Sequence, residues 1–538
     1  MAVIKVTAAD IVADNESDVL SFTEAINIVN GSLALEALNP KKRANVAGSL
    51  SGGNEIQVLL ERDSQIEVSS KSPQYPLVLS SSKPLVINGN GVELLSNGGT
   101  GLRVTCSNVT IKDMSFNGFE NCVRINGGAK AIENIAIENC NFKYVKYTGI
   151  LTGASESNGS LKGLRVENCA FFGTEGIEEE SFDNCTFSIE LQAATSEGAK
   201  EINNALLEDV IVRGNRFYGA ARVNVNMILA QEEQLVPQYK TVYNDCRLSN
   251  ILVEENEFNS GWDAVINLIT GCFNNRNSIA EDICIQNNKI TFGVWGIFLA
   301  GGEPLFDGGF SENCISRNVT VKDNYLKLTE GGAGEPSAAI AINGARTDMG
   351  VCTVQNSGIQ DYKIINNEIL GSEWGIMVEG AHGMLDNEFR SEMSNCFATD
   401  VLIEGNQFSD VGKPFLFYGA NLEGRRFDWN IGVPRRNKNW MPLRADHHSP
   451  SIIVENNITD RIVCKNNAIK GYRYMMIASG CKASGHAVTK GNVLGAEMVF
   501  ENNLYEEGEG RIFIQNEMLE DWAQGEDNQV LGKFNPSW

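Results

Sequence analysis

The sequence predicts an all-β solenoid, and three observations lead to this prediction. A phrase of about nine residues with alternating apolar positions returns eleven times along the 538-residue chain. A second short apolar segment lies between successive copies. Gly is plentiful (53) and Pro scarce (12), which is typical of many tight turns between short strands. One unit cannot bury its apolar face alone but stacked copies can, so the repeats predict one elongated core.

The repeated phrase predicts one strand and one turn in each unit. Its apolar residues alternate as in a strand with one buried face, and an apolar or aromatic residue re-enters the core just after the turn. An Asn or Cys occupies the turn itself, and recurring Asn predicts stacked side-chain amides and a left-handed backbone, which Asn tolerates. The copies begin at residues 108, 134, 163, 209, 250, 282, 318, 361, 400, 461 and 497.

The segments between the phrases predict a further strand in each unit. GIFLAGG (296–302) and GIMVEG (375–380) follow Trp295 and Trp374, and a related stretch follows Trp262. Similar segments stand at 123–127, 149–153, 339–344 and 414–419. Alternation turns Ile297 and Leu299 toward the core and Phe298 away from it.

This pattern resembles the right-handed parallel β-helix of the pectin-lyase-like superfamily, over roughly residues 80 to 510. The resemblance implies a single-stranded right-handed parallel β-helix of about eleven or more rungs, with long loops on one side. We expect three regions: a cap with the first strands (1–80), the β-helix (81–505) with a loop insertion at 421–450, and a C-terminal cap or docking tail (506–538).

A second resemblance concerns the N-terminus. Residues 4–30 are similar to the CSLREA segment that precedes β-helices in many surface adhesins, through Leu20, Ser21, Glu24, Ala25 and Ile26. Within this segment, SFTEAINIVN predicts a short amphipathic helix that covers the first rung and its open edge.

Composition argues against several partners and compartments. The formal charge of −24 disfavours binding to nucleic acid or to an anionic membrane surface. No apolar run of about 18 residues predicts membrane insertion, and the first residues lack the apolar region of a secretory signal. The thirteen Cys include no CxxC pair and favour buried free thiols made in a reducing compartment. We expect a virion or extracellular surface protein that either has lost a signal or is exported by another route.

In the superfamily, substrate lies along the outward face of the strands that follow the Trp residues. Here the expected outward column is apolar, whereas a groove for an acidic polysaccharide would display Lys, Arg and calcium-binding carboxylates. We expect this face to be covered, either by the chain's own long loops or by a partner subunit. The second alternative predicts a homo-oligomer, such as a trimer, or a larger assembly. The interface residues would be Val265, Phe298, Met377, Leu416 and Met476.

Two groups of residues are candidates for contact with a carbohydrate or surface glycan. Trp262, Trp295 and Trp374 either stack on sugar rings or shelter the bases of the loops. The 421–450 insertion carries a local charge of about +3, suited to an anionic glycan or an acidic partner surface. Its candidate residues are Arg425, Arg426, Trp429, Arg435, Arg436, Trp440 and Arg444.

Cofactors are not expected. Asp446, His447 and His448 are adjacent in sequence and predict no metal site without further ligands. An acidic stretch near the start is either a calcium site or, as we favour, a solvated loop; its residues are Asp10, Asp14, Glu16 and Asp18.

The sequence contains no recognisable catalytic signature. The candidate carboxylates are Glu379, Asp263, Asp428 and Asp446, and glycoside hydrolysis needs two carboxylates held about 5 to 9.5 Å apart. The leading hypothesis is a structural and recognition β-helix displayed on a virion or cell surface, like a tailspike, appendage or adhesin, whose long loops contact glycans. The alternative is a polysaccharide-degrading enzyme, a glycoside hydrolase or polysaccharide lyase, with its site on the long-loop face.

Overall fold

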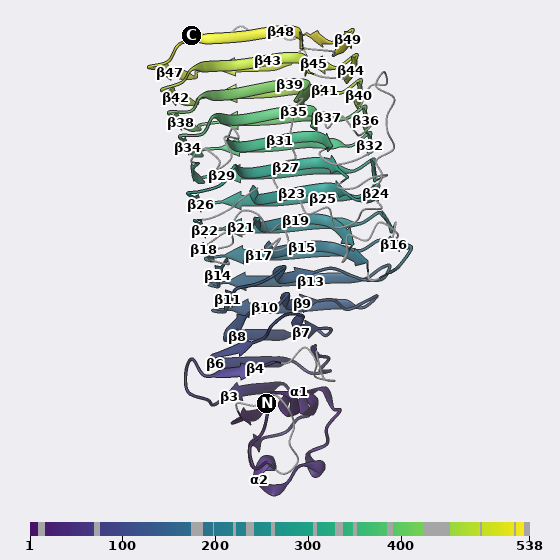
Figure 1. The fold of residues 1–538 in the computed structure, drawn as a ribbon, viewed down its shortest axis with the longest axis vertical. Helices are drawn as coiled ribbons and strands as arrows, with labels where there is room; N and C mark the ends of the chain where they lie inside the picture. Colours follow the sequence, from purple (N-terminus) through teal and green to yellow (C-terminus); the bar gives the residue numbers. More distant parts are fainter. Residues whose placement is uncertain are drawn as a thin grey trace.

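The repeats form three parallel sheets that run along one long axis, with the N-terminus at one end and the last rung at the other (Figure 1). Among the strands that the structure describes, the pairings are parallel apart from one antiparallel pairing, β1 with β2. The sequence prediction of a parallel β-helix is confirmed. This computed structural model describes residues 1–538 except 9–16, 69–75, 174–186, 197, 219–221, 233–240, 260–263, 305–308, 329–336, 348–351, 385–390, 424–451, 485–486, 496, 521–522 and 532–538.

Sheet B, the 13-stranded sheet, contains the strands that follow the Trp residues. Its strands are β5 (Leu77–Leu79), β7 (Thr100–Val104), β9 (Asn121–Ile125), β12 (Thr148–Thr152), β15 (Phe187–Ser196), β19 (Val223–Glu232), β23 (Ala264–Cys272), β27 (Trp295–Glu303), β31 (Ala338–Thr347), β35 (Trp374–Met384), β39 (Lys413–Glu423), β43 (Tyr474–Ala483) and β48 (Arg511–Leu519).

Sheet C, the nine-stranded sheet, follows sheet B in each later rung. Its strands are β16 (Glu201–Asn203), β20 (Val242–Asn244), β24 (Asn274–Arg276), β28 (Phe310–Glu312), β32 (Thr353–Gln355), β36 (Ser391–Ser394), β40 (Ile452–Glu455), β44 (Ala487–Lys490) and β49 (Gln524–Glu526).

Sheet A, the 28-stranded sheet, contains the repeated phrases. Its strands are β1 (Ala2–Val6), β2 (Val46–Ala47), β3 (Asn54–Val58), β4 (Gln65–Glu67), β6 (Leu85–Leu95), β8 (Val109–Asn117), β10 (Ala131–Glu138), β11 (Asn141–Lys143), β13 (Ser160–Glu167), β14 (Ala170–Phe172), β17 (Leu206–Arg213), β18 (Arg216–Tyr218), β21 (Arg247–Glu254), β22 (Glu257–Phe258), β25 (Ile279–Gln286), β26 (Lys289–Ile290), β29 (Ile315–Lys322), β30 (Tyr325–Lys327), β33 (Gly358–Ile365), β34 (Glu368–Leu370), β37 (Phe397–Glu404), β38 (Gln407–Ser409), β41 (Ile458–Lys465), β42 (Ala468–Lys470), β45 (Val493–Leu494), β46 (Met498–Glu501), β47 (Leu504–Glu506) and β50 (Gln529–Val530).

A ladder of buried Asn side chains connects the rungs, as the recurring Asn predicts. The Nδ2 of Asn288 donates to the Oδ1 of Asn324 (3.0 Å) and to the carbonyl oxygen of Val253 in the preceding rung (2.9 Å). The same pattern links Asn215, Asn256, Asn288, Asn324, Asn367, Asn406, Asn467 and Asn503. The left-handed residue is the one before each ladder Asn, as at Asn287 (φ 54°) and Asp323 (φ 56°).

Aromatic side chains stack along the same core. Phe142, Phe171, Phe217 and Phe258 occupy equivalent positions, with ring centroids 4.5–4.9 Å apart. This spacing is close to the distance between neighbouring strands, so each ring packs on the ring of the next rung.

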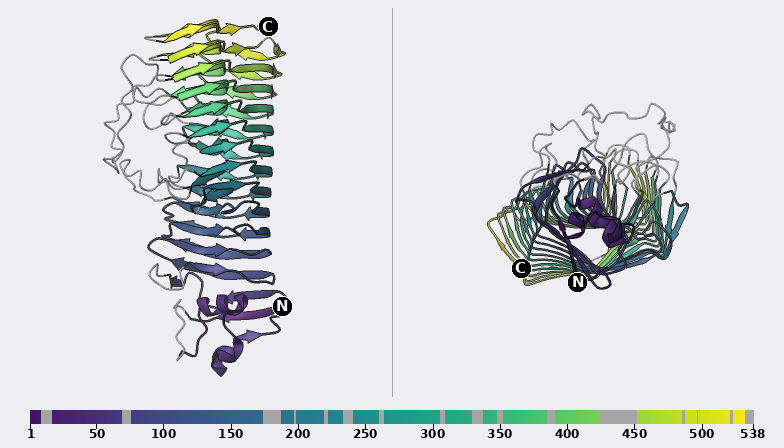
Figure 2. Two further views of the ribbon diagram at one scale, coloured as in Figure 1. Left: turned by 90° about the vertical axis from the view of Figure 1, so that its right-hand side faces the viewer. Right: turned by 90° about the horizontal axis from the view of Figure 1, so that it is seen from below.

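A helix covers the N-terminal end, as the sequence predicts. Helix α1 (Phe22–Asn30) begins with a capping box, in which Ser21 and Glu24 each bond the other's backbone N–H. Its buried Phe22 and Ile26 face the first strands, and in the end-on view it lies over the interior of the rungs (Figure 2). Two short helices follow, η1 (Leu35–Ala37) and α2 (Pro40–Arg43).

The solenoid continues beyond the predicted boundary at residue 505. β48, β49 and β50 pair in parallel with β43, β44 and β45 of the preceding rung. Residues 511–530 therefore build a further rung, which the weak apolar alternation of this stretch does not reveal.

Candidate functional site

The outward face of sheet B carries columns of side chains that stand opposite one another on successive strands. The outer column is defined here as Glu190, Asn226, Asn267, Phe298, Ala341, Met377, Leu416, Ile477 and Phe513. Two residues further along the strands, Asn343, Glu379, Tyr418 and Ser479 form a second column. After a bend, Arg346, His382, Asn421 and Lys482 form a third.

The structure corrects two members of the predicted apolar column. Ala264 pairs with Trp295, so Val265 stands opposite Gly296, two residues before Phe298. Asn267 takes the place expected for Val265. Met476 pairs with Phe415 and belongs to an inward column, and Ile477 stands beside Leu416 instead. The outer column is therefore polar over β15, β19 and β23 and apolar over the later strands.

The apolar part of the outer column is already buried within one chain. Phe298 is 4% exposed, Met377 0% and Leu416 3%, with no partner chain present. Of the two ways to cover this face, coverage by the chain itself is the one these values favour. The column offers no exposed apolar surface to a second copy at these positions.

Trp295 and Trp374 lie two rungs apart and contact each other across Ala338, with ring centroids 6.4 Å apart. Trp374 is 6% exposed, and the ammonium of Lys413 lies 5.8 Å from its ring centroid. Trp295 is half-buried, and the guanidinium of Arg346 lies over its ring. Because Trp374 is buried, it fits the alternative in which these rings shelter the bases of the loops. Contact of either Trp ring with a glycan stays a prediction.

Glu379 lies at the centre of a buried polar cluster. The His382 Nδ1 is 2.7 Å from its Oε2, and the Asn421 Nδ2 donates to its Oε1 at 2.7 Å. Glu379 is 0% and His382 3% exposed. When Nδ1 of His382 donates to Glu379, the neutral imidazole keeps its lone pair on Nε2. A His held in this way is equipped to act as a base.

Cations lie on both sides of this pair. In the third column Arg346 stands beside His382 on one side, and Asn421 and then Lys482 follow on the other. Arg346 pairs with Glu303 at 3.6 Å, and Lys482 lies 6.0 Å from the ring centroid of Tyr418. Tyr418 stands next to Glu379 in register, so the cluster combines a base, a phenol and two cations.

Several buried polar atoms here have no hydrogen-bond partner among the described residues. They are the Nδ2 and Oδ1 of Asn343, which stands beside Glu379, and the Oδ1 of Asn421. Buried amides are ordinarily satisfied within a protein or by water. These atoms have hydrogen-bonding capacity that no described residue uses.

Comparison with known proteins adds no argument about function. No protein-family model matches the sequence, and no curated protein matches it. Among solved structures, the chain is similar to the A-module of mannuronan C-5 epimerase AlgE6 of Azotobacter vinelandii (11% identity, TM-score 0.39, 97% of this chain and 99% of that chain). It is also similar to the AlgE4 A-module of the same organism (11% identity, TM-score 0.41, 94% and 95%). The function is therefore argued below from this chain's own side chains.

Of the candidate carboxylates, Glu379 alone lies within the part of the chain that the structure describes. Outside it lie Asp263, Asp428 and Asp446, together with the predicted glycan-binding residues Trp262, Arg425, Arg426, Trp429, Arg435, Arg436, Trp440 and Arg444. The same holds for Asp10, Asp14 and Glu16, whereas Asp18 forms an ion pair with Lys41.

Two further observations concern metals and membranes. Within the described ranges, no group of three or more His, Cys, Asp and Glu side chains is placed to hold a metal ion. None of the helices described here has both the length and the apolar character needed to cross a bilayer.

Sequence reasoning singled out Glu379 but missed His382 and Asn421. Strict alternation would place residues 379 and 382 on opposite faces of a strand. The strand bends at Gly380, where an added Cβ would lie 2.6 Å from the carbonyl oxygen of Gly419. The bend returns His382 to the face of Glu379. Glycines recur at the equivalent positions of the neighbouring strands, Gly344 and Gly419, and this recurrence is the sequence signal for the bend.

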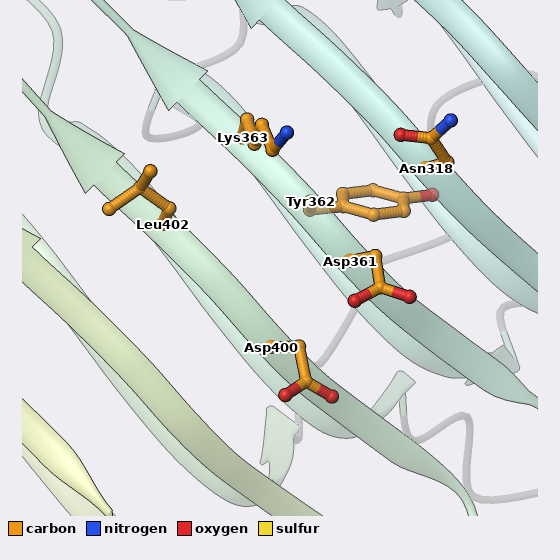
Figure 3. A pocket seen from close by; sticks show the side chains of 6 residues that line it. All are labelled: Asn318, Asp361, Tyr362, Lys363, Asp400 and Leu402. Carbon is orange, nitrogen blue, oxygen red and sulfur yellow. The ribbon is translucent and has the colours of Figure 1, made fainter.

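A shallow pocket on the outer side of sheet A is a weaker candidate. Figure 3 shows the side chains that line it, from Asn318, Asp361, Tyr362, Lys363, Asp400 and Leu402. Arg461 binds Asp400 with two bonds of 2.6 Å, which lowers the pKa of that carboxyl. Tyr362 donates to Ser316 at 2.6 Å. These groups are engaged in linking successive rungs, so we assign the pocket a structural role.

Proposed function

We propose that this protein acts on an acidic polysaccharide, by removing the proton from the carbon next to a uronate carboxylate. Such a reaction needs a base, an acid and positive charge that stabilises the carbanion-like transition state. In the Glu379 cluster, His382 would take the proton through Nε2, Glu379 would hold its ring, and Asn421 would hold Glu379. Tyr418 would donate a proton, and Arg346 and Lys482 would bind the carboxylate.

The arrangement fits this chemistry better than glycoside hydrolysis. Hydrolysis uses two carboxyl groups on either side of the scissile bond. Glu379 has both of its oxygens engaged by His382 and Asn421. Glu303, another carboxylate on this face, is two strands away and pairs with Arg346. The observation that carries the proposal is the orientation of His382 between two cations in a buried site.

The test uses a panel of uronate polysaccharides in deuterated water. Proton removal is detected as deuterium incorporation by NMR, and β-elimination as the ultraviolet absorbance of an unsaturated product. We expect the wild type to show at least one of these, and His382→Ala to lose about 100-fold or more in kcat, the usual contribution of a positioned base. Thermal unfolding of each variant checks that the fold is kept. A folded wild type that gives neither signal on any polymer would overturn the proposal.

Glycan recognition without turnover is a second candidate, because the nearly complete burial of the cluster in the isolated chain disfavours a catalytic site that a polymer must reach. Display on a virion or cell surface belongs with this candidate. The free thiols of the cysteines in the described ranges fit synthesis in a reducing compartment. Binding of a polymer with neither deuterium incorporation nor elimination is the outcome that would support it.

A further inference from the structure

The last rung of the solenoid leaves inward-facing apolar residues exposed. β48 and β49 are the terminal strands of sheets B and C, and each pairs with one neighbour among the described strands (Figure 1). Ile512 and Ile514 of β48 continue the inward columns of Met476 and Ala478. Ile514 is 40% exposed, whereas Met476 and Ala478, one rung earlier, are 3% and 0% exposed. The core is therefore open to solvent at this end.

The N-terminal end, in contrast, is closed by the chain itself. β1 pairs in parallel with β3 on one side and antiparallel with β2 on the other, so its outer edge is occupied. Helix α1 contacts β1, β3 and β5, with Phe22 and Ile26 buried. Proteins commonly protect sheet edges in such ways, because unpaired N–H and C=O groups bind other strands. No described element does the same for β48.

The open end lies in a strongly acidic part of the chain. Residues 501–531 contain nine acidic residues and one basic residue, Arg511. Glu506, Glu509 and Glu520 are exposed and form no ion pair with a described residue, unlike the neighbouring carboxylates that bind Lys470 and Lys490. An apolar edge surrounded in sequence by such carboxylates fits an apolar segment that also carries Lys or Arg.

A second copy of this chain matches the edge less well. Two C-terminal ends placed together would set like charges opposite one another, which costs free energy. At the N-terminal end, the cations of helix α2 are already engaged within the chain. Lys41 and Lys42 form ion pairs with carboxylates, and Arg43 donates to backbone carbonyl oxygens. The charges therefore favour a different, basic partner.

We propose that the edge of β48 is a docking site for a separate protein, which adds to sheet B a strand of alternating apolar and basic residues. The backbone of that strand pairs with the N–H and C=O groups of β48 that point away from β43. Its apolar side chains cover Ile512 and Ile514. Alternation turns its Lys or Arg side chains to the outer face, where the acidic last rung attracts them. This inference does not depend on the proposed function.

The probe is a synthetic peptide of nine residues, the length of β48, in which Lys alternates with Ile and Val. The control peptide has the same composition with its Lys residues grouped at one end, so the charge is kept and the alternation is lost. Fluorescence anisotropy measures binding to the full chain, and amide hydrogen exchange detects strand addition. We expect the alternating peptide to bind about tenfold more tightly. It should slow exchange in β48 but not in β43, which is paired on both sides.

Two variants with the same added charge separate strand addition from general attraction. Ile514→Glu should weaken binding of the alternating peptide about tenfold, because it places a carboxylate in the apolar row. Gln515→Glu, at the next residue and on the exposed outer face, should not weaken it. If Ile514→Glu does not fold, Ile514→Ser replaces it and the same loss of affinity is required.

Other outcomes would overturn the proposal. Equal affinities for the two peptides, or unchanged exchange in β48, would show attraction by charge alone. Amides of β48 that exchange as slowly in the free protein as those of β43 would show that the chain closes this edge itself. If light scattering finds a dimer of the free chain that Ile514→Glu separates, the occupant of the edge is a second copy.

Discussion

Glu190 shows what a single buried carboxyl group costs this fold. Its pKa is about 7 in the folded chain because burial disfavours the charged form, against an ordinary value of 4.5. Below pH 4.5 the group is protonated in both the folded and the unfolded chain, so its effect on stability vanishes. As pH rises toward 7 the unfolded chain releases the proton first, and stability falls until the folded group also ionises.

We therefore expect Glu190→Gln to gain stability relative to the wild type as pH rises. Between pH 5.5 and 8.5 the difference in unfolding free energy should change by about 2 kcal/mol, from 1.36 kcal/mol for each pKa unit. Urea unfolding followed by circular dichroism measures it. Glu257→Gln serves as the control, since 37% of the Glu257 side chain is exposed. A stability difference that is the same at both pH values would contradict the assignment.

At the scale of the element, the Asn ladder is what keeps the rungs in register. The Oδ1 of Asn324 accepts from both the backbone N–H and the Nδ2 of Asn288, and its Nδ2 reaches the carbonyl oxygen of Ile285. Asn324 is 1% exposed, so water does not replace these bonds when the side chain is removed. A buried group left without its partner costs about 1 to 3 kcal/mol.

Asn324→Ala should accordingly lower the free energy of unfolding by about 3 kcal/mol. The control is Asn318→Gly, which removes a side chain on the outer surface and keeps the left-handed backbone (φ 52°) available. We expect less than about 1 kcal/mol for the control. Equal losses for the two variants in thermal or urea unfolding would show that the ladder contributes no more than a surface amide.

The same elements show how far sequence alone leads. Recurring Asn, alternating apolar residues and the repeat length predict the parallel β-helix and the stacked amides, because each depends on local pattern. The register between neighbouring strands is harder to predict from sequence. Aligning Trp262 with Trp295 places Val265 beside Phe298, which is wrong by two residues because Ala264 is the partner of Trp295.

The face of a side chain is hardest to predict where the backbone departs from regular strand geometry. Met476 was assigned outward, but the pairing of β43 with β48 is irregular between Tyr474 and Met476, and Met476 faces inward beside Phe415. His382 was missed because Gly380 interrupts the alternation that the prediction assumes. In both cases the face of a side chain depends on backbone geometry rather than on its position in a repeat.

At the scale of the whole molecule, the apolar residues of the outer column have two explanations: the chain itself covers them, or they form an interface with a second copy. Its middle is buried in a single chain, with Met377 0% exposed, whereas Phe513 on the last strand is 37% exposed. A charge introduced at Met377 would be buried in a closely packed site, so it acts on folding. At an oligomer interface the same charge would separate folded chains.

We expect Met377→Glu to lower the unfolding midpoint strongly and to reduce the yield of folded protein, without producing a stable folded chain of smaller mass. Phe513→Glu, in the same column but exposed, should leave both the midpoint and the mass measured by light scattering close to those of the wild type. If Met377→Glu instead folded normally and reduced the mass from that of an oligomer to that of one chain, the column would be an interface. Burial by the chain itself would then be insufficient to explain its apolar character, and contact with a second copy would take its place.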